Sequence, residues 1–151
     1  MLKRINAIQI IYFGLIVGVA LFYGIAFLLV SGSNFQPAIT TVNQVIYKMI
    51  LIFGILAGIP LVISVTQKAI GKIDASLDLA AKITLYQTQF LIRMAVLDGL
   101  GLLSVVFYIN SGDYSVALIG VAVFIVMLLS FPSVKKISTD LNADEESLLK
   151  D

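Results

Sequence analysis

Hydrophobic residues form four long runs along the chain, separated by short polar segments. The first run, residues 7–30, carries no charge, and the others cover residues 45–66, 90–109 and 114–131. About 20 helical residues cross the roughly 30 Å hydrocarbon core of a membrane. Strands of a membrane β-barrel would alternate polar and apolar residues, whereas these runs are apolar all round. The pattern predicts an all-α integral membrane protein with four transmembrane helices in a bundle.

The composition agrees with burial in a lipid bilayer. Hydrophobic residues make up 60% of the chain and charged residues 13%, and the mean hydropathy is +1.04. Soluble proteins carry about 25% charged residues. The apolar part of the first run exceeds the 7–15 residues typical of a signal peptide, so we interpret it as a retained helix.

Lysine and arginine predict the orientation. Four crossings place nearly all of them on one side and leave Lys48 alone on the other; the first group is Lys3, Arg4, Lys68, Lys72, Lys82, Lys135 and Lys136. The positive-inside rule then predicts cytoplasmic N- and C-termini in a multi-pass protein of the cytoplasmic (inner) membrane. We expect a transmembrane domain over residues 1–134 and an acidic cytoplasmic tail over residues 135–151.

Two cytoplasmic segments have helical patterns. In residues 68–87 apolar positions recur at helical spacing, which predicts an amphipathic connector at the interface or a helical extension of the second and third spans. A solvated hairpin stabilised by an Asp78–Lys82 pair is the alternative. In the tail, Asn142 as N-cap and Glu145 at the third helical position predict a short helix. This acidic end could bind a soluble partner, or it could be a frayed terminus.

Cysteine and histidine are both absent. Their absence excludes disulfides, thiolate and imidazole metal ligands, and nucleophiles activated by histidine. We therefore predict no metal site and no cofactor. A hydrolase or transferase needs convergent acid, base and oxyanion groups, and the spans offer Asp98 alone, so we predict a non-enzymatic protein. A basic footprint for nucleic acid is missing as well.

Asp98 is the candidate functional residue. It lies about 12 Å into the third span, where an ionised carboxylate costs roughly 2.5–3.5 kcal/mol even on the lenient insertion scale. Such a group faces the bundle interior, pairs with another group, or stays protonated. It could bind a proton or a cation, or it could be a neutral acid bonded to a hydroxyl of Tyr12, Tyr23 or Ser64 on another helix.

Other polar residues of the spans suggest anchoring. Arg93 lies near the cytoplasmic end of the third span, from which its long side chain can reach the interface. Tyr47, Tyr108 and Tyr114 cluster at the outer boundary and Tyr86 at the inner one, which is typical of interfacial anchors.

Small residues predict close helix packing, either within the chain or between copies. Gly54 and Gly58 form one small-xxx-small pattern. Pro60 removes the backbone hydrogen bond to residue 56, so Gly58 and Pro60 predict a hinge in the second span. The packing glycines are Gly14, Gly18, Gly24, Gly54, Gly58, Gly99 and Gly101.

Four identities suggest an internal repeat. A shift of 80 residues aligns Gln9, Phe27, Ser31 and Gly32 with Gln89, Phe107, Ser111 and Gly112. The alignment suggests two hairpins of the same orientation, that is, a parallel duplication.

The segment from Arg93 to Val106, RMAVLDGLGLLSVV, resembles the carboxylate helix of rotary ATPase proteolipid subunits. That resemblance implies an ion-carrying Asp98. The chain departs from the family because its loop at residues 31–43 is uncharged and predicted outside. Small multidrug transporters also combine four helices with one membrane acid, but their acid lies in the first helix. We assign the chain to neither family.

Two functions remain after these exclusions. The first is an accessory or scaffold subunit that binds other membrane subunits or copies of itself. It accords with the few polar groups in the spans and the packing glycines. The second is an oligomeric proton- or cation-coupled transporter that uses Asp98.

Overall fold

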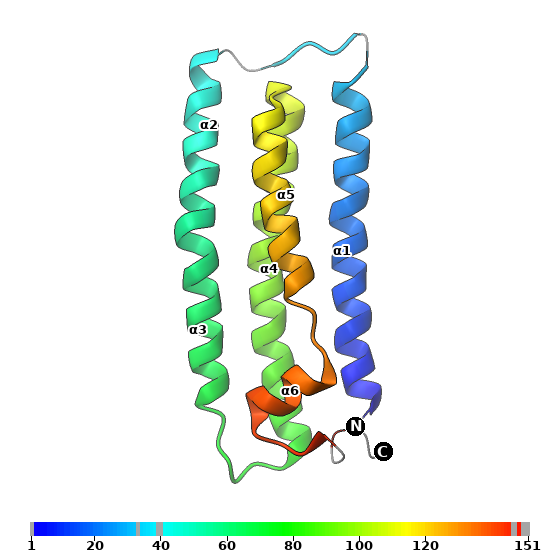
Figure 1. The fold of residues 1–151 in the computed structure, drawn as a ribbon, viewed down its shortest axis with the longest axis vertical. Coiled ribbons are helices and arrows are strands. Elements are labelled where there is room, and N and C mark those ends of the chain that lie inside the picture. Colours follow the sequence, from blue (N-terminus) through cyan, green and yellow to red (C-terminus); the bar gives the residue numbers. More distant parts are fainter. Residues whose placement is uncertain (1, 33, 39–40, 146–147, 149–151) are drawn as a thin grey trace.

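The computed structural model describes residues 2–32, 34–38, 41–145 and 148. These residues form helices and connecting segments, without any strand, which confirms the all-helical prediction. The elements in order are α1 (Leu2–Val30), α2 (Thr41–Phe53), the π-helical turn η1 (Gly54–Gly58), α3 (Ile59–Gly71), α4 (Leu79–Ser111), α5 (Tyr114–Leu129) and α6 (Val134–Leu141). Figure 1 shows them as a long bundle with α6 folded beneath.

Three helices are long and apolar enough to cross a membrane. They are Arg4–Val30, Asn43–Gly71 and Leu79–Ser111. A fourth crossing is obtained only if α5 and α6, which meet at a bend of 75°, are counted as one broken span. By itself α5 has 16 residues, about 24 Å of helix, which is short of the hydrocarbon core. The chain therefore has three to four candidate spans by length and composition.

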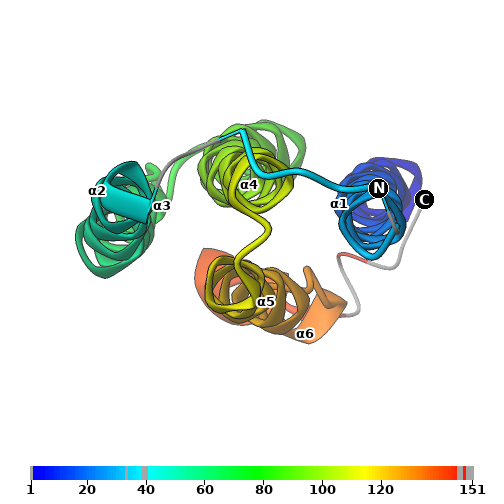
Figure 2. The same cartoon turned by 90° about the horizontal axis from the view of Figure 1, so that it is seen from above.

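Helix α4 is the centre of the bundle. It contacts α1, α3 and α5, and Figure 2 shows α1 and the α2–α3 rod on opposite sides of it. Helix α5 packs against α4 and also reaches α1. The face of the α1–α4 pair that points away from α5 has no further helix on it within the described chain (Figure 2).

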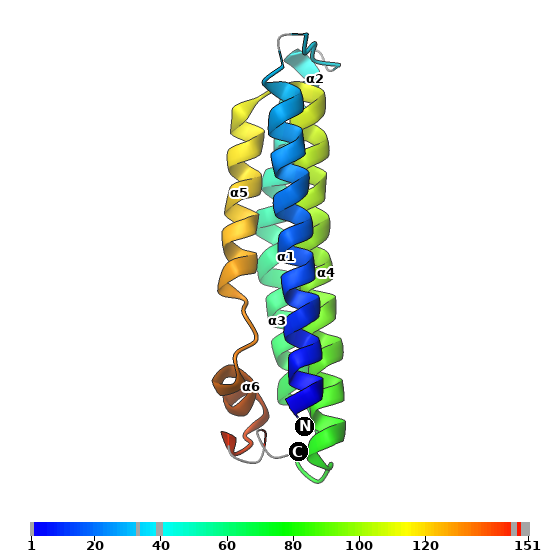
Figure 3. The same ribbon diagram turned by 90° about the vertical axis from the view of Figure 1, so that its right-hand side faces the viewer.

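The break between α5 and α6 follows from Pro132, which cannot continue a helix. The carbonyl groups at the end of α5 would lack donors, and α1 supplies two. The Tyr12 hydroxyl donates to Leu128 O at 3.1 Å, and Gln9 Nε2 donates to Pro132 O at 3.2 Å. Figure 3 shows the extended stretch that these bonds hold beside α1. Non-helical backbone near the membrane is thus satisfied by protein, as it must be.

The second span is one continuous rod in which the expected disruption at Pro60 is absorbed locally. Pro60, the second residue of α3, directly follows the π-turn Gly54–Gly58, and this widened turn accommodates the N–H that Pro60 lacks within the continuous helix. Residues 43–71 form a single candidate span. Gly58 and Pro60 therefore border a widened turn of a continuous helix.

The segment 68–87 is divided between the end of α3, a turn at residues 72–78 and the start of α4. Asp78 is the N-cap of α4 and accepts from Ala81 N at 3.2 Å. Lys82 donates instead to Ala75 O at 2.9 Å. Thus the structure uses both residues to hold the turn, and they form no ion pair with each other.

Asn142 does not start a helix, contrary to the prediction. It is the C-cap of α6, with a left-handed backbone (φ 47), a conformation that asparagine tolerates better than most residues. Leu148 N donates to Asp144 O at 3.3 Å, so a helical turn begins about two residues later. Leu149 and the rest of the predicted tail helix lie outside the described residues.

Candidate functional site

Most polar groups in the middle of the bundle fix one helix to another. The Tyr23 hydroxyl on α1 hydrogen-bonds the fully buried Ser104 on α4, and Ser104 Oγ donates to Gly101 O at 2.6 Å. Gly120 on α5 faces the same pair: a Cβ there would overlap both Tyr23 Oη and Ser104 Oγ. These groups form the three-helix contact of α1, α4 and α5, which we call the inner contact.

Arg93 is buried, with a relative exposure of 5%, and does not lie at the lipid interface as expected. Its Nε donates to Thr66 Oγ1 on α3 at 3.1 Å, and the Thr66 hydroxyl donates onward to Val62 O at 2.7 Å. On α4, two helical turns nearer the start of the helix, Tyr86 interacts with Asp140 of α6. Arg93 thus ties α3 to α4, and Tyr86 ties α6 to α4.

The tyrosines predicted as interfacial anchors divide into two groups. Tyr86 and Tyr108 are buried in the bundle, because α4 is covered on three sides, and so they do not face lipid. Tyr114 is exposed, and Tyr47 is half-buried and stacks on Phe107. The sequence shows how far each tyrosine is from the end of its hydrophobic run. It does not show whether the tyrosine faces the bundle or its surroundings.

The predicted packing glycines also divide into two groups. A Cβ at Gly54 would lie 3.1 Å from Leu100, one at Gly58 3.8 Å from the same side chain, and one at Gly101 3.6 Å from Val19. These three allow α4 to approach α2, α3 and α1. The other four have nothing within 4 Å of such a Cβ, so they pack against no described residue of the chain: Gly14, Gly18, Gly24 and Gly99.

Asp98 lies at the edge of the bundle. Met94 and Gly101, one turn before and after it, are buried, whereas Ala95 and Gly99 beside it are exposed. Asp98 itself is half-buried and makes no hydrogen bond or ion pair with any residue that the structure describes. The three hydroxyls considered as partners are elsewhere: Tyr12 bonds α5, Tyr23 bonds Ser104, and Ser64 is exposed on α3.

The depth of Asp98 follows from helix geometry. It precedes the buried Tyr108 by ten residues, about 15 Å along the axis. Tyr108 lies one turn before the end of α4 at Ser111. For a helix that crosses a hydrocarbon core about 30 Å thick, this distance is about half of the core.

Asp98 lies level with Gly18 of α1. Arg4 on α1 donates to Thr84 Oγ1 on α4 at 2.6 Å. Helices α1 and α4 run parallel. Gly18 and Asp98 lie fourteen residues, or about four turns, farther along them, on nearly the same helix sides as Arg4 and Thr84. Val19 beside Gly101 confirms this register, which is close to the shift of 80 seen in the sequence repeat. We call the strip through Ile11 and Gly18 on α1 and Leu91 and Asp98 on α4 the outer flank.

The outer flank points away from α5. On α1, the opposite side carries Gln9, which bonds the chain after α5, and Ala20, which lines a cavity with Val121 and Phe124 of α5. Ile11 and Gly18 are half-buried, as residues at the border of a contact are. The outer flank therefore borders the α1–α4 contact on its uncovered side.

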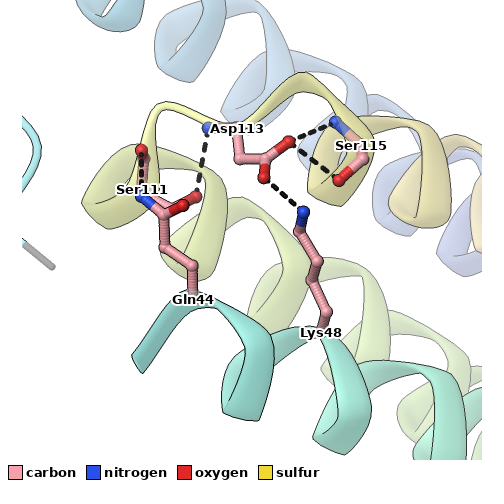
Figure 4. Close-up of polar contacts among 5 residues, drawn as sticks. All are labelled: Gln44, Lys48, Ser111, Asp113 and Ser115. Atoms are coloured by element: carbon pink, nitrogen blue, oxygen red, sulfur yellow. Dashed lines mark hydrogen bonds and ion pairs between the residues drawn. The ribbon is translucent and has the colours of Figure 1, made fainter. Parts of the chain in front are cut away.

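At the end of the bundle where α4 turns into α5, two charged side chains of the described residues pair with each other. Lys48 of α2 forms an ion pair with Asp113, which also accepts from Ser115 N and Oγ at 2.8 Å and so caps α5 (Figure 4). Gln44 donates to Ser111 O at 3.3 Å. The bond from Lys48, reinforced by Ser115, holds the pKa of the Asp113 carboxyl below its ordinary value.

Two cavities of the bundle lack Asp98 in their walls. One, of about 250 Å³, is apolar and lies between α1 and α5, against Ala20, Tyr23, Val121 and Phe124. The other, of about 120 Å³, lies between the α3–α4 turn and α6, with Lys82 and Asp140 in its wall. Asp98 thus lines neither of these two hollows.

Among the described residues no group of three or more acidic side chains could hold a metal ion. The chain matches no family model, and no match is found among curated proteins or solved structures. Function must therefore be argued from the site alone. Gly120 and Thr66 were missed by sequence reasoning, because a single glycine or threonine in an apolar run does not indicate which residue it faces.

Proposed function

We propose that this protein is a non-enzymatic accessory subunit of a larger membrane complex, and that the outer flank is where it binds. The observation that carries the proposal is the position of Asp98: a carboxylate at mid-membrane depth, at the edge of the bundle, without a partner among the described residues. Intramembrane charges usually pair or face a protein interior. A neighbouring subunit would provide that interior.

The unpacked glycines support the same proposal. Gly14, Gly18 and Gly99 leave open space where a second backbone could approach, and close approach is the main source of helix association in lipid. Inside the bundle, by contrast, the polar groups of the inner contact are occupied in joining helices, which suits a scaffold better than a reaction site.

The proposed threading has four crossings with cytoplasmic termini in the cytoplasmic membrane. It is supported by the location of the charges: Arg4, Lys68, Lys72, Lys82, Lys135 and Lys136 belong to the end where α1 begins, and Lys48 belongs to the other end. The short α5 completes the fourth crossing together with the segment that leads to α6. The positive-inside rule gives the orientation.

The alternative is an oligomeric transporter in which a proton or a cation neutralises Asp98. The observation that favours it is the same missing partner, since a bound ion could provide the compensating charge. In that case copies of this chain would enclose the carboxylate.

Native mass spectrometry of the tagged protein, extracted from its own membrane in mild detergent, separates the two functions. A stoichiometric complex with a different membrane protein is the result we expect. A homo-oligomer that lacks any foreign subunit would overturn the accessory function and favour transport.

A further inference from the structure

The partner class can be inferred from the chemistry of the outer flank. Resting on the proposed function, we propose that a transmembrane helix of the partner subunit packs along this flank and presents a lysine or arginine to Asp98. An uncompensated carboxylate at this depth is costly, and a basic side chain is the protein group that neutralises it. An ion pair there would also fix the depth at which the partner helix binds.

The flank has room for such a helix beside the carboxylate. Gly18 lies level with Asp98, and a Cβ at Gly18 or Gly99 would meet nothing within 4 Å. Each position therefore leaves space for part of a side chain from outside. A long basic side chain could cross that space and reach the carboxylate from a neighbouring backbone.

A second copy of this chain does not fit the charge requirement. A symmetric contact through the outer flank would bring two Asp98 carboxylates together. The basic residues nearest in depth are already committed: Arg93 is buried against Thr66, and Lys48 is paired with Asp113 at the outer end. Charge complementarity therefore selects a foreign helix.

Because the chain has no cysteine, a thiol reagent labels this protein at a single introduced cysteine. A single Gly18→Cys change, labelled with benzophenone maleimide in native membranes, places a photocrosslinker on the outer flank. The matched control is Leu61→Cys on α3, an exposed position on the other side of α4 from α1. Each is made with Asp98, Asp98→Glu and Asp98→Asn, and the adducts are identified by mass spectrometry.

We expect position 18, and not position 61, to give an adduct with a membrane protein that carries lysine or arginine in the crosslinked span. Asp98→Asn should lower the adduct yield about tenfold or more, because one partner of a buried pair is lost, while Asp98→Glu keeps most of it. Replacing the partner's basic residue by glutamine should cause the same loss. Melting of the purified Asp98→Asn chain checks that it still folds.

Three results would overturn the inference. One is a foreign adduct whose yield is unchanged by Asp98→Asn, and another is a foreign complex without an adduct at position 18; either would leave the accessory function standing. The third is an adduct between two copies of this chain. If native mass spectrometry also finds no foreign subunit, the proposed function itself fails.

Discussion

Ser104 and Asp98 lie on the same helix, six residues apart, and their surroundings differ in every respect. Ser104 is fully buried, bonded to Tyr23 and Gly101 O, and closed in by Gly120. Asp98 is half-buried, without a partner in the described chain, and level with Gly18, where an added Cβ would meet no described atom within 4 Å. The polar groups around Ser104 are satisfied within the chain, whereas the Asp98 carboxylate has no partner among the described residues. Helix α4 thus has one side whose polar groups bond within the chain and another side whose carboxylate has no partner among the described residues.

The largest loss of stability is expected from Gly120→Ala, which alters the surroundings of Ser104. The new Cβ would overlap the Tyr23 and Ser104 hydroxyls, and forced overpacking costs about 1–3 kcal/mol. Gly18→Ala is the matched control, because its Cβ meets nothing within 4 Å and helical alanine is favoured over glycine by up to about 1 kcal/mol. Equilibrium unfolding of the purified chain in detergent measures both. Equal stability of the two variants would contradict the distinction between the inner contact and the outer flank.

The second largest change in stability is expected around Arg93, which is buried. Thr66→Val removes the acceptor of the Arg93 Nε bond, and a hydrogen bond to a charged group contributes about 1.5–3 kcal/mol. Arg93→Met should cost less, since it removes the buried charge itself and leaves the Thr66 hydroxyl bonded to Val62 O. The double variant should therefore be close to Arg93→Met alone. If Arg93→Met lowered the stability more than Thr66→Val, the bond to Thr66 would not be what offsets the cost of burying Arg93.

The hydrophobic runs predicted where most helices lie in the sequence. They could not predict which neighbouring helix covers each face of a helix. Periods of apolar residues predict that residues 90–109 span the membrane, and α4 contains them. They do not tell which neighbour covers each side, so Arg93 was expected at the interface and is buried, and Asn142 was expected to begin a helix and ends one. Asp98 was identified from its charge alone. Its position at the edge depends on where α1 packs, which is a property of the whole bundle.

The smallest loss of stability is expected from substitutions of Asp113, which is paired with Lys48 and so contrasts with Asp98. Asp113→Ala removes both the cap of α5 and the ion pair with Lys48, for about 1 kcal/mol from the cap and at most about 1 kcal/mol from the exposed pair. Asp113→Asn keeps a capping oxygen and should lose only the second part. Thermal melts of both variants beside the wild type separate the two contributions.

The pH dependence of that ion pair has a definite sign. Because the folded-state pKa of Asp113 is lowered, its contribution is fully present above the unfolded value of about 3.9 and is lost as the pH falls through the lower folded value. The stability difference between wild type and Asp113→Asn should therefore be constant from neutral pH to about 5 and disappear in stronger acid. A difference that grew on acidification would mean that Lys48 does not stabilise the carboxylate. The contrast between the paired Asp113 and Asp98, which has no partner among the described residues, would then lose its basis.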